Sequence, residues 1–294
     1  MFENQKHSQG IVPSNVKYFR NLRTDCEKCF GLCCVALYFS ASEGFPRDKE
    51  PGQPCTNLQP NSRCSIHEKL KDRGLKGCLA FDCFGAGQKV AQVSFGGQDW
   101  RKVPESSKQM FEVFLIMRQL HELLWYLTEA LTLQPARSIH GEISSVLEVT
   151  ERLTHLPPDS LLKVDVNQHR TDVNVLLLKT SELVRADVRH GQKVRSGQKK
   201  TFGRGADFIG ADLRKVDLRG VSLRGAYLIA ADLRGIDLSG TDLIGADFRD
   251  ADLRRADLTK SFFLTQAQIS SAKGDASTRL PPLLNRPAHW DISQ

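Results

Sequence analysis

Residues 204–265 carry a large apolar residue at every fifth position, a spacing that suits neither of the two regular secondary structures. A helix buries a side chain about every 3.6 residues and a strand every second residue. On a helix, a step of five would distribute the apolar side chains around the whole circumference. The twelve positions follow one another without a slip: Phe208, Leu213, Leu218, Leu223, Leu228, Leu233, Leu238, Leu243, Phe248, Leu253, Leu258 and Phe263. We therefore expect a solenoid, in which each repeat forms one side of a coil.

A second inward position lies two residues before each large one, and the residue between them is usually Asp. This second set is small or β-branched: Ala206, Ala211, Val216, Val221, Ala226, Ala231, Ile236, Thr241, Ala246, Ala251, Ala256 and Ser261. In a four-sided coil, twelve such repeats give about three coils, which stack ~4.8 Å apart into a column about 14 Å tall. The motif A-(D/N)-(L/F)-x-x over residues 204–265 resembles that of the pentapeptide-repeat family. The resemblance implies a right-handed quadrilateral β-helix of about three coils.

The outer surface of such a solenoid can be predicted in columns, because residues twenty apart stack. One column contains Asp212, Asp232 and Asp252, with an Arg two residues after each. Alternating charges of this kind solubilise a face, although each exposed pair contributes little stability. Two other faces carry apolar residues: Ile209, Tyr227 and Ile229 on one, and Ile244, Phe262 and Leu264 on the next. We expect the helical part of the chain to cover both faces, with a homodimer as the alternative.

The segment after the last coil, residues 266–294, has the features of a cap. A β-solenoid must protect the strand edges at its ends. Thr265 and Gln268 fit a capping box at the start of a short helix, and Gly274 fits a helix stop. Trp290 is expected to latch the remaining, Pro-rich segment.

All eight cysteines lie between residues 26 and 83, which indicates a separate cysteine-rich head. They are Cys26, Cys29, Cys33, Cys34, Cys55, Cys64, Cys78 and Cys83. Two thiolates separated by two residues can reach one ion from a tight turn, and Gly31 gives that turn its freedom. Thiolates suit zinc, iron and iron–sulfur clusters.

The order of these cysteines resembles that of the bacterial CxxxCC-type domains, which are described as zinc- or iron-chelating. The resemblance covers residues 26–88 and implies that all eight cysteines are metal ligands. In those domains an Arg-Pro often precedes the penultimate cysteine, whereas this chain has RGLKGC at that place. Two alternatives are four disulfides, which a reducing cytosol disfavours, and unligated redox thiols with Cys33 and Cys34 as the sensor.

The middle of the chain, residues 101–188, is predicted to be helical. Apolar residues at helical spacing predict a core helix over about 106–133, and two amphipathic helices are predicted over about 138–155 and 158–187. HELLWYLTEA lacks the second His of a metalloprotease helix, so His121 and Glu122 are expected at the surface or in capping. FGAGQK, residues 84–89, is expected to be a loop.

Composition and charge narrow the class of protein. The 294 residues are 40% hydrophobic and 26% charged, without a membrane-spanning run or an apolar leader, so we expect a cytoplasmic protein. Residues 185–204 hold seven basic residues and one acidic one, nearly all of the net charge of +7. Since no aromatic residues alternate with these charges, a solvated linker is favoured over nucleic-acid binding.

The sequence thus predicts a multi-domain protein that combines α-helices with a β-solenoid. Its expected parts are a cysteine-rich metal-binding head (1–100), a helical domain (101–188), a basic linker (189–203), the β-helix (204–265) and the cap (266–294). We expect a non-enzymatic scaffold that binds zinc or iron and docks another protein through the β-helix or the apolar faces. The alternatives are an iron–sulfur or metal-dependent enzyme or redox sensor, and protection of DNA gyrase. Zero net charge over residues 205–294 argues against the DNA mimicry on which gyrase protection depends.

Overall fold

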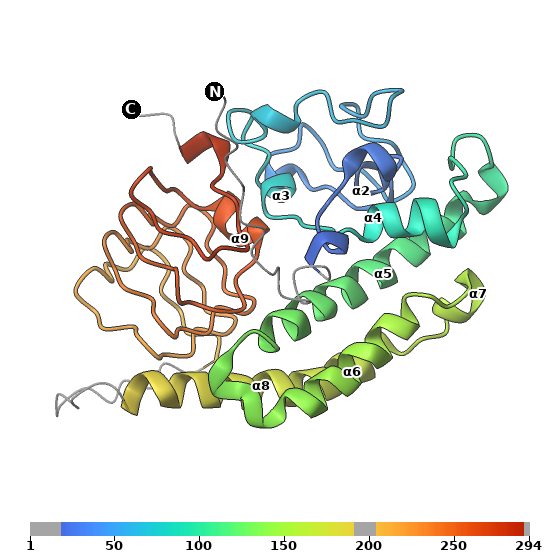
Figure 1. Cartoon of the computed structure of the whole chain (residues 1–294). Coiled ribbons are helices and arrows are strands. Elements are labelled where there is room, and N and C mark those ends of the chain that lie inside the picture. Colours follow the sequence, from blue (N-terminus) through green and yellow to red (C-terminus); the bar gives the residue numbers. More distant parts are fainter. Residues whose placement is uncertain (1–18, 191–203, 291–294) are drawn as a thin grey trace, which may run out of the picture.

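The structure, a computed structural model, describes residues 19–190 and 204–290 (Figure 1). The cysteine-containing segment lies at one end of a long helix, and the solenoid packs against the other end of that helix. The α-helices are α2 (Leu32–Ala36), α3 (Lys76–Leu79), α4 (Ala86–Lys89), α5 (Pro104–Ala130), α6 (His140–Leu153), α7 (Pro158–Leu161), α8 (Val166–His190) and α9 (Gln266–Ser271). Short 3-10 helices are η1 (Cys26–Lys28), η2 (Ala41–Glu43), η3 (His67–Lys69), η5 (Gln134–Ile139) and η6 (Ala288–Trp290), and η4 (Val90–Ser94) is a π-helix.

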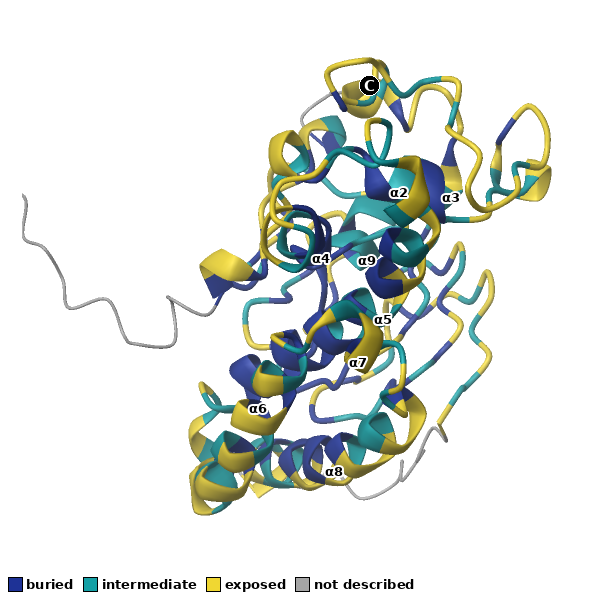
Figure 2. Ribbon diagram, turned by 90° about the vertical axis from the view of Figure 1, so that its right-hand side faces the viewer, coloured by how far each residue is buried: buried dark blue, intermediate teal, exposed yellow. Residues whose placement is uncertain are grey.

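Helix α5 joins two hydrophobic cores. Its first half, from Met110 to Leu120, is buried with α2, α4 and α7. Its second half, from Leu123 to Ala130, is buried with α6, α8 and the interior of the solenoid. Figure 2 shows α5 in the middle of the molecule, with α4 above it and α6 and α8 below. The long helix therefore packs against both the cysteine-containing part and the solenoid.

The helical middle differs from the prediction at one place. The predicted helix over 158–187 is two helices, α7 and α8, separated by residues 162–165. Asp165 ends the break, because its carboxylate accepts the backbone N–H of Gln168 at 2.9 Å. A side chain that accepts the backbone N–H three residues further on is an N-cap, and an N-cap marks the start of a helix. The apolar pattern of the sequence does not show this signal. The expected linker 189–203 lies outside the described residues apart from its first two, which end α8.

The solenoid is held by parallel bridges between residues twenty positions apart. They include Asp212 with Asp232, Ser222 with Asp242 and Asp237 with Asp257. Each bridge is isolated, because a turn follows every short extended stretch and no longer strand develops. The large inward side chains from Leu213 to Phe263 are buried, as the five-residue period predicts.

The cap follows the expected plan with one correction. Thr265 and Gln268 form the capping box of α9. The helix ends at Ser271, before Gly274, so Gly274 is not its stop. Gly274 is required instead by packing, because a Cβ there would lie 2.4 Å from the ring of Trp290. Lys273 and Arg279 then continue the bridge ladder beyond the last coil, so this segment covers the exposed edge.

The polar face agrees with the predicted columns. Each Arg pairs with the Asp two residues before it, as in Arg214–Asp212 at 2.7 Å. Two also reach the next coil: Arg214 lies 3.2 Å from Asp232, and Arg234 lies 3.7 Å from Asp252.

Of the two apolar faces, the described helices cover one and leave the other exposed. Phe262 and Leu264 are buried, and Tyr126 of α5 packs edge-on against Phe263. Ile209 and Tyr227, in contrast, are 57% and 50% exposed. The expectation that the chain's own helices would cover both faces is therefore wrong for the face with Tyr227.

Candidate functional site

The eight cysteines lie on short elements at one end of α5. Cys26 begins η1, Cys33 and Cys34 lie in α2, and Cys78 lies in α3, while the remaining four are in turns or loops. All eight are free thiols in the structure. The expected head extends to residue 1, but residues 1–18 lie outside the described part.

A tight turn brings the CxxC pair next to α2. Gly31 has φ +69° and precedes α2, a conformation that side chains other than glycine adopt at a cost. A Cβ at Gly31 would lie 2.4 Å from Cδ1 of Leu58. Leu58 in turn bridges Cys64, and the N–H of Cys55 donates to the carbonyl of Cys34 at 2.9 Å. Close packing at this glycine thus links the first cysteine motif to the downstream cysteines.

We describe the thiols as two groups that overlap at Cys34, whose charge also acts on Cys26 and on Cys33. In the first group, the Cys29 thiol donates to the carbonyl oxygen of Cys26 at 3.4 Å, and a side-chain hydrogen bond with Cys26 lowers the pKa of Cys29 to about 7. Cys83 also acts electrostatically on Cys26 and on Cys33, and burial raises the pKa of Cys83. We call Cys26, Cys29, Cys33 and Cys83 the first thiol group.

The second thiol group contains Cys34, Cys55, Cys64 and Cys78. Burial raises the pKa of Cys78 to about 12, and the charges of the other three members add to that rise. The two groups meet at α2, where the Sγ atoms of Cys33 and Cys34 are 3.9 Å apart. A hydrogen bond from the Cys33 thiol lowers the pKa of Cys34.

Lys49 supplies a positive charge beside the second thiol group, and no motif in the sequence marked it. Its ammonium lies within hydrogen-bond distance of four backbone carbonyl oxygens, at 2.6 Å for Leu37, 2.8 Å for Gln53, 3.1 Å for Glu50 and 3.3 Å for Val35. Burial lowers the pKa of Lys49, and the nearby thiols of Cys55 and Cys34 oppose that effect. This lysine therefore holds the loop 35–53 in shape, and it interacts electrostatically with the thiols.

As a metal centre, the cysteines fit in ligand type and number but not in the distances between them. Eight thiols in two sets of four match the ligand type and number that zinc and iron–sulfur clusters take. Across residues 19–190 and 204–290, however, no three His, Cys, Asp or Glu side chains are close enough together to hold one ion. Metal binding would therefore require the thiols of each group to move closer together.

Two expectations near this region are wrong. His121 is 4% exposed, not a surface residue, and its Nδ1 lies 2.7 Å from the carbonyl oxygen of Phe84. Burial lowers the pKa of His121 to about 4. The segment 84–89 contains α4 and not only a loop, because Gly85, at φ +77°, starts the helix. Glu122 is half-buried and lies within 3.7 Å of Arg118 and 3.6 Å of Arg170.

Comparison with known proteins identifies the repeats. A family model described as pentapeptide repeats matches residues 200–225 and 222–259, in eight copies. The "Uncharacterized protein YybG" of Bacillus subtilis (strain 168) is 57% identical over 283 residues, which cover 96% of this chain and 99% of YybG. The chain belongs to the YybG family. Because the two proteins align over nearly their full lengths, the relationship includes both the cysteine-containing part and the solenoid.

A solved structure was also found, that of HetL, a pentapeptide repeat protein involved in heterocyst differentiation regulation from the cyanobacterium Nostoc sp. strain PCC 7120. HetL is 22% identical, and the match covers 31% of this chain and 51% of HetL with a TM-score of 0.13. Among the described residues, no helix has the length and apolar character needed to cross a membrane.

Proposed function

We propose that this protein is a non-enzymatic scaffold whose cysteine-containing part binds zinc or iron and whose solenoid docks another protein. The proposed docking element is a right-handed quadrilateral β-helix of about three coils. The two thiol groups are the proposed ligand sets, one for each of two ions or for the two halves of a cluster. Each ion would pull four thiolates together and so stabilise a part of the chain that has a small core of its own.

The observation that carries the proposal is the arrangement of the thiols. Eight free cysteines occupy one end of the molecule; the charges of Cys29 and Cys83 act on Cys26 and Cys33, and those of Cys34, Cys55 and Cys64 act on Cys78. Four thiolates drawn together around one point could not all be charged without a cation between them. A bound metal supplies that cation and deprotonates the thiols.

Metal content and visible absorption of protein purified without oxygen and without added metal test this proposal. Paired variants refine it: Cys26→Ser/Cys29→Ser removes ligands of the first group only, and Cys64→Ser/Cys78→Ser removes ligands of the second. We expect metal in the wild type and a partial loss in each paired variant. Colourless protein with zinc indicates a structural role, and iron with charge-transfer absorption indicates the enzyme or redox-sensor alternative. Wild-type protein without metal refutes the proposal.

A second candidate function is thiol-based redox sensing, and the contact between Cys33 and Cys34 favours it. Their sulfurs are 3.9 Å apart, and the lowered pKa of Cys34 favours its reactive thiolate. Mass spectrometry of protein treated with a mild oxidant tests this candidate. A disulfide at this pair in metal-free protein supports sensing, whereas eight unmodified thiols rule it out.

The surface of the solenoid supports protein docking better than DNA mimicry. Aspartates of its polar face are paired with arginines in the same coil, so the face does not present a field of one sign. The exposed Ile209 and Tyr227 provide an apolar face that the described residues leave open. We therefore place the partner, or a second copy of this chain, on that face.

A further inference from the structure

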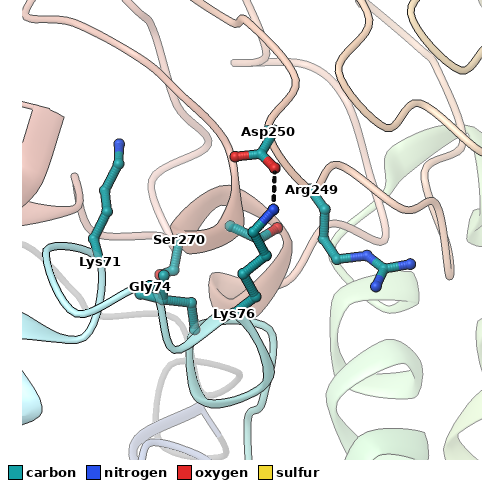
Figure 3. Close-up of a pocket in the computed structure, with 8 residues that line it drawn as sticks. Lys71, Gly74, Lys76, Arg249, Asp250 and Ser270 are labelled. Carbon is teal, nitrogen blue, oxygen red and sulfur yellow. Dashed lines mark hydrogen bonds and ion pairs between the residues drawn. The ribbon is translucent and has the colours of Figure 1, made fainter. Parts of the chain in front are cut away.

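The side chain of Lys89, the last residue of α4, contacts a histidine and not an acid. Its Nζ lies 2.9 Å from Nε2 of His155, which follows the end of α6. Among the described residues, no carboxylate lies within ion-pair distance of Lys89. Lys76 shows the more usual arrangement, because its ammonium lies 2.8 Å from the carboxylate of Asp250, as Figure 3 shows. The contact of Lys89 therefore suits a different chemistry.

The hydrogen bonds of His155 decide which of its two ring nitrogens carries the proton. Nδ1 lies 2.9 Å from the carbonyl oxygen of Glu151. Since a carbonyl oxygen can only accept, Nδ1 carries the proton and donates it to this bond. Nε2 of the neutral ring then has a free lone pair, which faces Nζ of Lys89. His155 is thus oriented as a base toward the amine.

The surroundings of Lys89 favour its neutral, nucleophilic form. The side chain is half-buried, and burial lowers the pKa of Lys89, although the charge of Glu151 acts in the opposite direction. Proteins activate weak nucleophiles by placing a base within hydrogen-bond distance and orienting that base through a third group. Lys89, His155 and the carbonyl of Glu151 form this arrangement.

A pocket of about 530 Å³, open to solvent, lies beside the pair. It is lined by Glu148, Glu151, Arg152 and His155, the base itself. Their spacing of three and four residues places them along one face at the end of α6. Two carboxylates and one guanidinium give the lining a net negative charge, which disfavours an anionic reactant. The pocket therefore suits a small, neutral electrophile.

We propose that Lys89 is a site of acylation, with His155 as the base and a neutral acyl thioester as the acyl donor. The lone pair of the Lys89 amine attacks the carbonyl carbon of the thioester, and a C–N bond forms. Nε2 of His155 takes the proton that the amine loses. The C–S bond then breaks, and the departing thiolate takes this proton from His155 and leaves as a thiol. The products are an amide on Lys89 and one free thiol.

Acylation at this position changes the contact between two parts of the molecule. It removes the positive charge of Lys89, whose contact with His155 joins α4 to the end of α6. Neither residue is a cysteine, so the reaction does not depend on the proposed metal.

Reaction of the full chain with the neutral thioester S-acetyl-N-acetylcysteamine tests the proposal. Peptide mass spectrometry measures the rate of acetylation at each lysine, after hydroxylamine has removed acetyl groups from cysteine thiols. The exposed Lys163 and the paired Lys76 are internal controls. The variant is His155→Gln, which removes the base and keeps a polar side chain. His67→Gln is the matched control, because His67 is exposed in η3. Acetyl phosphate serves as the anionic donor for comparison.

At neutral pH, we expect Lys89 of the wild type to react about tenfold faster than Lys163 and Lys76. His155→Gln should remove most of this preference, and His67→Gln should leave it unchanged. Acetyl phosphate should show a smaller preference for Lys89, because two carboxylates line the pocket.

Three results would each overturn the proposal: Lys89 reacts no faster than the control lysines, His155→Gln keeps the full preference, or acetyl phosphate shows the larger one. The first comparison uses only the wild type and so does not depend on the folding of a variant. Melting curves show whether His155→Gln is folded.

Discussion

Replacing Glu129 with Gln should stabilise the protein, and the gain should grow as the pH rises. Glu129 lies at the end of α5, fully enclosed between that helix and the last coil of the solenoid. Its Oε1 accepts the backbone N–H of Phe263 at 3.0 Å, while Oε2 has no partner among the described residues. Burial raises the pKa of Glu129 from 4.5 to about 8, and the charge of Asp242 adds to the rise.

The direction of the pH effect on stability follows from the proton that Glu129 takes up when the chain folds. Between about pH 4.5 and 8 the unfolded chain carries an ionised Glu129 and the folded chain a neutral one. Stability therefore falls as pH rises through this range, by about 1.4 kcal/mol per pH unit. Glutamine keeps the acceptor for Phe263 and has no charge to lose. Glu129→Gln should thus gain little near pH 4.5 and about 3 kcal/mol near pH 7.

Urea unfolding followed by tryptophan fluorescence at several pH values measures this difference. Trp125, one turn before Glu129 on the same helix, reports on the region concerned. Glu112→Gln is the matched control, because Glu112 is exposed on α5. This variant removes one carboxylate from the same helix without touching the buried site. Parallel stability curves for the wild type and Glu129→Gln between pH 5 and about 8 would refute the reasoning.

Two further predictions concern the contact between α8 and the solenoid. Gly235 and Gly240 both have positive φ, but a Cβ at Gly240 would lie 2.4 Å from Val188 of α8 and one at Gly235 would contact nothing. Urea unfolding should therefore show a loss of about 1 kcal/mol for Gly235→Ala and roughly 2–4 kcal/mol for Gly240→Ala, and equal losses would contradict this packing. Arg224→Met leaves Asp242 buried without its 3.0 Å ion pair, so it should cost about 3–5 kcal/mol. Adding Asp242→Leu should recover most of that loss, and a double variant less stable than the single one would contradict the assignment.

The repeat was predictable because its information is local. Every inward residue from Leu213 to Phe263 occupies the same position in a five-residue unit, so each unit specifies its own orientation. The capping box was predictable for the same reason, since Thr265 and Gln268 are three residues apart. The unpredicted features depend on contacts between distant segments. His121 is buried because its ring meets the carbonyl of Phe84, 37 positions away. The thiol groups also interleave along the chain, since Cys33 and Cys83 share one group while Cys34 belongs to the other.

The outward residues of the solenoid show what the repeat pattern alone does not predict. Asp212, Asp232 and Asp252 form a bridged column of identical residues on the polar face. Two other bridged columns depart from Asp: Ser222, Asp242 and Phe262 in one, and Asp207, Tyr227 and Asp247 in the other.

Each of these two columns places an apolar residue on the outer surface, Phe262 in one and Tyr227 in the other. Only the column with Phe262 is covered. Asp242 and Phe262 are buried, and Arg224, the partner of Asp242, also contacts Asn174 of α8. Tyr227 is exposed. Positions where the repeat departs from Asp can therefore identify the faces that are not polar. Which segment covers each of these faces depends on where the helices pack, and the repeat itself does not specify that. The face with Tyr227, which the described residues leave exposed, departs from the same repeat pattern as the covered one, and this likeness supports the proposal that it is a docking surface.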